Sequence, residues 1–134
     1  MENIKKTYFK KFEGKQFSYY KLEKFINKGD FSAVFKSINK ENNKNYAIKM
    51  MLKSDIDDEK KFLNECDMMK NSINVIKYYE IFEENEFYFI VMELCDLNLL
   101  EYLNNKKNIS LYELREILIQ FNNALKYMFD NNII

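Results

Sequence analysis

The sequence predicts an α+β fold in which a five-stranded antiparallel sheet precedes a helical tail. Three apolar strand patterns come first, a stretch with helical periodicity follows, and two more strand patterns precede the tail. Short polar turns join successive strands within each group, which is typical of an antiparallel sheet rather than of a doubly wound parallel one. With 134 residues, 47% of them hydrophobic, the chain can bury one modest core.

The first three strands are expected at residues 19–26, 33–39 and 46–52. Each combines aromatic or β-branched residues with polar ones in partial alternation, which is typical of half-buried strands. The segments between them, 27–30 and 41–44, are rich in Asn, Lys and acidic residues and contain turn formers. The three strands are therefore predicted to form a meander.

A helix is expected over residues 57–70. Phe62, Cys66 and Met69 recur at i, i+4 and i+7, which places them on one helix face. Residues 57–59 are all acidic, and negative charge is favourable at a helix N-terminus. This segment separates the predicted meander from the strands that follow.

A hairpin and a helical tail complete the pattern. Strands are expected at residues 75–82 and 87–92, joined by a polar turn. Ser110 and Glu113 form a capping-box pattern, and apolar residues then keep a helical period as far as residue 128. The last quarter of the chain is therefore expected to be helical.

Composition and terminal patterns exclude several classes of protein. The formal net charge is zero, so no nucleic-acid partner is expected, and the absence of His excludes ordinary zinc-site spacing. Residues 1–18 are Lys-rich and lack a sustained period, so we expect a flexible basic flank, with one short packed piece as the alternative, and no signal peptide. The longest apolar run, 87–92, is too short to span a bilayer. Cys66 and Cys95 are expected to be reduced thiols, a disulfide being the alternative, and the default location is cytoplasmic.

The turn between the first two strands has a distinctive composition. Residues 26–34 read Ile-Asn-Lys-Gly-Asp-Phe-Ser-Ala-Val and resemble the glycine-rich loop of protein kinases, whose backbone approaches the phosphates of a nucleotide. Only Gly29 occupies a glycine position of that pattern, and Asn27 and Ser32 replace the other two glycines. Taken by itself, this segment is better explained as an ordinary polar hairpin turn.

The third strand adds a lysine in an apolar setting. Tyr46-Ala47-Ile48-Lys49 resembles the V-A-I-K element of protein kinases. That resemblance implies that Lys49 contacts the α- and β-phosphates of ATP and pairs with a helix glutamate. Glu65, in the expected helix over 57–70, stands at the position of that glutamate. The alternatives are a surface lysine and a solvated glutamate.

The fifth strand and the residues after it also resemble the kinase pattern. Residues 89–96 resemble the strand and hinge behind the adenine, which implies that Met92 is the gatekeeper. The resemblance implies that Glu93 and Cys95 offer backbone groups to the adenine edge, and that Val34 and Ala47 cover the ring. The implied nucleotide site consists of Ile26, Asn27, Gly29, Ser32, Val34, Ala47, Lys49, Glu65, Met92, Glu93 and Cys95.

These resemblances divide the chain into a kinase-like small lobe at 19–92, a hinge at 93–98 and two helices of an incomplete large lobe at 99–134. No histidine is present for an H-R-D motif, and neither glycine lies in a D-F-G motif, so no catalytic or metal-binding residue is expected. We therefore expect the ATP-binding portion of a protein kinase directed at Ser/Thr hydroxyls, which alone is inactive. Magnesium would require the missing large-lobe residues, and the protein substrate is not indicated.

Two other functions remain open at this point. The altered hairpin at 26–34 is compatible with a non-catalytic, pseudokinase-like regulatory or interaction module. An unrelated α+β binding module with chance motif matches is the third hypothesis. The order of the motifs along residues 19–134 favours the first interpretation.

Overall fold

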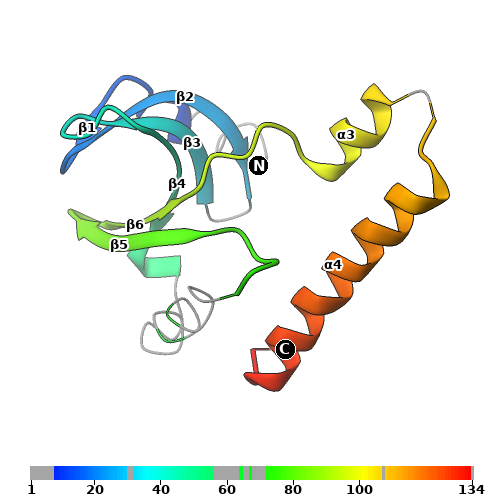
Figure 1. Cartoon of the computed structure of the whole chain (residues 1–134). Coiled ribbons are helices and arrows are strands. Elements are labelled where there is room, and N and C mark those ends of the chain that lie inside the picture. The colour runs from blue at the N-terminus through cyan, green and yellow to red at the C-terminus, as the bar shows by residue number, and fades with distance from the viewer. Residues whose placement is uncertain are drawn as a thin grey trace.

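The computed structural model describes residues 8–29, 32–55, 64, 67, 72–106 and 108–133. Along these residues a curled sheet comes first and two helices follow (Figure 1). The elements are β1 (Gln16–Phe17), β2 (Tyr20–Lys28), β3 (Ser32–Asn39), β4 (Asn45–Leu52), a 3₁₀ turn η1 (Lys53–Asp55), β5 (Tyr78–Glu84), β6 (Phe87–Met92), α3 (Leu99–Asn105) and α4 (Leu111–Asp130).

The sheet is antiparallel throughout the part of the chain that the structure describes. Its strand order is β1-β2-β3-β4-β6-β5, so the predicted meander and the predicted hairpin join through β4 and β6. The five predicted strands correspond to β2 to β6, and β1 is a sixth, two-residue strand that we did not predict. The α+β fold predicted from the sequence is therefore confirmed.

Alternation along the strands separates the sheet into two faces. Ile48 and Met50 on β4 are fully buried and point to the same side, as do their register partners Phe35 on β3 and Phe89 on β6. These side chains form the centre of one aromatic-rich core, inside the curl of the sheet that Figure 1 shows. The opposite face of β4 carries Lys49, and it forms the candidate site described below.

Side chains close the gap between the two edges of the curled sheet. The Tyr20 hydroxyl on β2 donates a hydrogen bond of 2.5 Å to Glu80 on β5, and the Tyr20 ring stacks on Phe82. The backbone N–H of Ser18 donates to the Glu84 carboxylate at 2.8 Å. Burial, together with the Glu80 hydrogen bond, raises the pKa of Tyr20 to about 12. Glu80 and Glu84 of β5 therefore hold the two edges together by accepting hydrogen bonds from Tyr20 and Ser18. We call this contact between the edges the seam.

The N-terminal segment differs from the prediction. Phe9, Phe12 and Phe17 are buried in the same core as β4 and β6. The ring centroids of Phe12 and Phe87 are 5.3 Å apart, and those of Phe17 and Phe89 are 4.7 Å apart. Three aromatic side chains therefore anchor residues 8–18 inside the curl, so this part of the flank predicted over 1–18 is a packed piece.

Both C-terminal helices begin with a capping box. Asn98 caps α3 with Glu101, and Ser110 caps α4 with Glu113, as the sequence pattern predicted for α4. Hydrogen bonds from Lys106 and from Ser110 hold the pKa of Glu113 at about 2. Neither helix has a buried residue. No helix formed by the described residues is long and apolar enough to cross a membrane.

The helix predicted over 57–70 lies outside the described residues except for two positions. Asn64 and Asp67 are helical and exposed. The next strand was predicted to begin at residue 75. It begins at Tyr78 instead, because residues 73–75 form a bend.

Candidate nucleotide-binding site

The β2–β3 hairpin contains the segment that resembles a phosphate-covering loop. The backbone N–H of Gly29 donates to the carbonyl of Ser32 at 2.8 Å, and the N–H of Lys28 donates to Asn27 Oδ1 at 2.8 Å. A Cβ atom on Gly29 would lie 3.0 Å from Ser32 Oγ, so a larger residue there would press on the serine. Polar groups of the hairpin therefore form hydrogen bonds with one another, and Gly29 occupies a position with little room for a side chain.

Four of the residues predicted to bind nucleotide share one face of the sheet. In the β3–β4 register Val34 lies opposite Lys49, and in the β4–β6 register Ala47 lies opposite Met92. Directly opposed residues of an antiparallel pair have their side chains on the same face. Because Ala47 and Lys49 are two positions apart on β4, all four side chains lie on the face opposite to the core.

The surroundings of Lys49 on this face are apolar. Its neighbours across the two adjacent strands are Val34 and Ile90, and Ile90 forms a small buried cluster with Tyr78. Lys49 itself is half-buried, and it forms no hydrogen bond or ion pair with the residues that the structure describes. A half-buried ammonium among apolar side chains favours an anion as its partner. Glu65, the predicted partner, lies outside the described residues.

The hinge segment leaves β6 with its backbone fixed on one side. The N–H of Glu93 donates to the carbonyl of Lys77 at 2.8 Å, and the N–H of Lys77 donates to the Glu93 carboxylate at 3.2 Å. Within the described ranges, neither the Glu93 carbonyl nor the Cys95 N–H has a protein partner. One acceptor and one donor are therefore available beside Met92, which suits the edge of a purine ring.

The thiol of Cys95 is exposed and free. Desolvation by its surroundings, and then the negative charges of Glu93 and Asp96, raise the pKa of the Cys95 thiol. At neutral pH the thiol therefore stays protonated and is a weak nucleophile. Its part in the predicted site is confined to the backbone.

Two residues of this face were not identified from the sequence. Ile90 lies opposite Lys49, and Lys36 lies opposite Ala47 with its ammonium 4.0 Å from a Glu23 carboxylate oxygen. Alternation along β3 indicates that Lys36 shares a face with Val34. The register between β4 and β6, which places Ile90, cannot be read from either strand alone.

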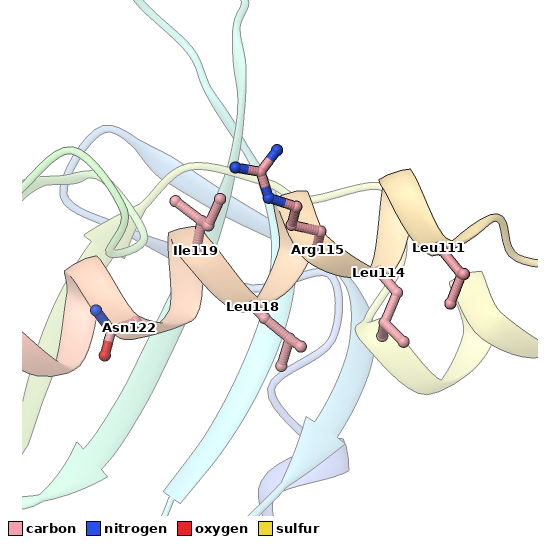
Figure 2. A pocket seen from close by; sticks show the side chains of 6 residues that line it. All are labelled: Leu111, Leu114, Arg115, Leu118, Ile119 and Asn122. Carbon is pink, nitrogen blue, oxygen red and sulfur yellow. The ribbon is translucent and has the colours of Figure 1, made fainter.

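Two hollows among the described residues lie away from Lys49. One of about 400 Å³ runs along the exposed apolar row of α4 (Figure 2), and another of about 430 Å³ is lined by residues 96–99 and Tyr102. Neither of these two hollows is lined by Lys49. The first hollow is lined by Leu111, Leu114, Arg115, Leu118, Ile119 and Asn122. No cluster of three metal-ligating side chains occurs in the part of the chain that the structure covers.

Comparison with known proteins identifies the family. The model of the protein kinase domain matches residues 20–134. Calcium-dependent protein kinase 5 of Plasmodium berghei is 35% identical over 119 residues, which are 86% of this chain and 21% of that protein. Calcium-dependent protein kinase 4 of Plasmodium falciparum is 30% identical over 121 residues, with 86% and 23% covered.

A more distant group of kinases gives the same result. The serine/threonine-protein kinase polo of Drosophila melanogaster is 29% identical over 121 residues, which are 86% of this chain and 21% of that protein. The chain thus spans about a fifth of the length of these curated relatives. With the curled sheet, the two capped helices and a family match over residues 20–134, this chain belongs to the protein kinase family.

Proposed function

We propose that this chain is the ATP-binding portion of a protein kinase that transfers the γ-phosphate of ATP to Ser/Thr hydroxyls. The observation that carries the proposal is the common face of Val34, Ala47, Lys49 and Met92. That face combines apolar cover for an aromatic ring with one half-buried cation that has no anionic partner among the described residues. A ligand with a flat base and phosphates matches both features.

The adenine would lie against the apolar part of this face. Ala47 is buried and small, so it leaves room for a ring between β4 and Met92 on the neighbouring strand. The Glu93 carbonyl would accept a hydrogen bond from the adenine amino group, and the Cys95 N–H would donate to a ring nitrogen. Each such bond contributes about 1 kcal/mol net, so burial of the ring would provide much of the affinity.

The phosphates would lie toward Lys49 and the β2–β3 hairpin. Lys49 would neutralise negative charge on the α- and β-phosphates, and Ile26, Asn27, Gly29 and Ser32 would cover them. The Gly29 N–H already donates to the Ser32 carbonyl, so this donor is not free to bind a phosphate. We therefore expect weak binding in which Lys49 dominates the phosphate contacts, with Glu65 orienting it.

Phosphate transfer needs groups beyond this site. ATP supplies the γ-phosphate, but this sequence contains neither the H-R-D nor the D-F-G motif, which provide the base and the magnesium ligands in protein kinases. We propose that the 134-residue chain alone transfers no phosphate. A protein substrate and a cytoplasmic location stay predictions, and no observation favours the regulatory module expected as the alternative.

Calorimetric titration with ATP tests the proposal through Lys49→Met. Loss of a charge-assisted hydrogen bond costs about 1.5–3 kcal/mol, so the ATP Kd should rise roughly tenfold or more. Lys40→Met is a matched control, because Lys40 is exposed and lies in the turn after β3 rather than on a strand that carries the site. No ATP binding at millimolar concentration, or equal Kd values for the two variants, would refute the nucleotide site.

A further inference from the structure

The strand that enters the β2–β3 hairpin is irregular. In the register of β2 with β3, Leu22 pairs with Ser37 but Lys24 with Lys36, and the register shifts again between Phe25 and Asn27. Each shift adds one residue to β2 that has no opposite partner. Such bulges bend a strand and leave its direction less well determined by the ladder.

The N-terminal segment contacts the other edge of β2 at these bulges. The Gly14 N–H donates to the Leu22 carbonyl at 2.6 Å, and the Leu22 N–H donates to the Lys15 carbonyl at 2.9 Å. Farther along β2, the N–H of Phe25 donates to Glu13 Oε1 at 2.6 Å, in a partly buried position. A carboxylate thus takes the place of a neighbouring strand's carbonyl between the two bulges.

Glu13 is itself held firmly. Its backbone N–H donates to the Lys10 carbonyl at 3.1 Å, and the preceding Phe12 is buried against Phe87 in the core. Hydrogen bonds from an N–H to a carboxylate are short and strong compared with those between neutral groups. The carboxylate therefore links the core to a point one residue before Ile26, where the predicted phosphate-covering segment begins.

We infer that Glu13 is a positioning residue for nucleotide binding, acting through the Phe25 N–H on residues 26–29, which lead into the hairpin. The inference rests on the proposed function. Glu13 lies outside the stretch that matches the protein kinase domain, which begins at residue 20. Its contact sets the direction in which the bulged strand enters the hairpin, and thereby the distance between the hairpin backbone and phosphates near Lys49.

A pair of substitutions separates the reach of the side chain from its charge. Glu13→Asp keeps the charge but shortens the side chain by one methylene, whereas Glu13→Gln keeps the reach and an acceptor oxygen. Glu13→Ala removes both, and Glu41→Ala is a control because Glu41 is an exposed glutamate in the turn after β3. The Asp and Ala variants should bind ATP roughly three- to tenfold more weakly, while Gln should stay within about twofold of the unaltered chain.

Titration with ATP and with adenosine, on the same 15N-labelled samples, gives the decisive readout. A positioning role predicts that Glu13→Asp weakens ATP binding but leaves adenosine binding within about twofold, because only the phosphates lie under the hairpin. The amide signal of Phe25 should move in the Asp and Ala variants and stay close to its original position in Gln. The Asp variant keeps the test valid if the Ala variant does not fold.

Three results would overturn the inference. An unchanged ATP affinity in Glu13→Asp, with the Phe25 amide signal displaced, makes the contact purely structural and leaves the proposed function intact. Equal weakening of both ligands has the same meaning. If the unaltered chain binds neither ligand, the proposed function and this inference fail together.

Discussion

Replacing Phe17 by alanine measures how much the N-terminal segment contributes to the domain. The Phe17 side chain is 7% exposed, lies 4.7 Å from the Phe89 ring and 5.9 Å from the Phe12 ring, and belongs to the core cluster. Removing a buried phenyl ring costs about 3–5 kcal/mol through lost burial and the cavity that remains. Because Phe17 lies on a two-residue strand near the end of the curl, partial collapse should bring the cost to about 3 kcal/mol.

Urea unfolding followed by circular dichroism gives the free energy of unfolding for this comparison. Small domains have only about 5–15 kcal/mol of stability, so Phe17→Leu is a milder variant for which we expect about 1 kcal/mol. Phe129→Ala is the matched control, since the Phe129 ring on α4 is 71% exposed and its loss should cost less than about 0.5 kcal/mol. If Phe17→Ala and Phe129→Ala have equal effects, residues 8–18 do not form part of the cooperative core.

Two further predictions concern titratable groups. The pKa of Tyr20, about 12 in the folded chain against 10 as its ordinary value, means that its contribution to stability is complete below pH 10 and disappears as the pH rises toward 12. Tyr20→Phe should remove this alkaline loss in unfolding curves measured between pH 9 and 12, and an unchanged pH dependence would refute the assignment. The pKa of Glu113, about 2 against 4.5, gives the opposite dependence: its contribution is present above pH 4.5 and is lost as the pH falls toward 2. Circular dichroism at 222 nm should show helix content falling over that acidic range, and Glu113→Gln should lack this component; an identical acid profile would contradict the cap.

Strands whose residue pattern is visible in their own sequence could be predicted. The N-terminal segment could not, because contacts with distant residues determine its place. The runs that became β3, β4 and β6 carry their pattern in the residues themselves, and the Ser110–Glu113 cap marks the start of α4. The packed segment at 8–17 has aromatic residues without a sustained period, and its strand has only two residues. Its place depends on rings of β6 that lie far away in the sequence, so local periodicity could not identify it.

The candidate site shows the same division. Ala47 and Lys49 were predicted to act together, and their spacing of two residues already places them on one face of a strand. Their proximity to Met92 and Ile90 follows from the register between β4 and β6, which a one-residue slip would reverse. The bulges of β2 and the contact from Glu13 depend on backbone geometry that no residue pattern in the sequence specifies.

The seam between the edges of the sheet has a consequence for where this domain begins. An unpaired strand edge offers its backbone groups to other chains and promotes aggregation. Here the N-terminal segment covers the outer edge of β2, while glutamates of β5 and of the turn after it receive hydrogen bonds from Tyr8, Ser18 and Tyr20. A chain shortened to start at residue 20, where the family match begins, would keep every strand that carries the candidate site. It would also expose the edge of β2 as a template for self-association, so we expect the N-terminal segment to be needed in addition to the matched region 20–134.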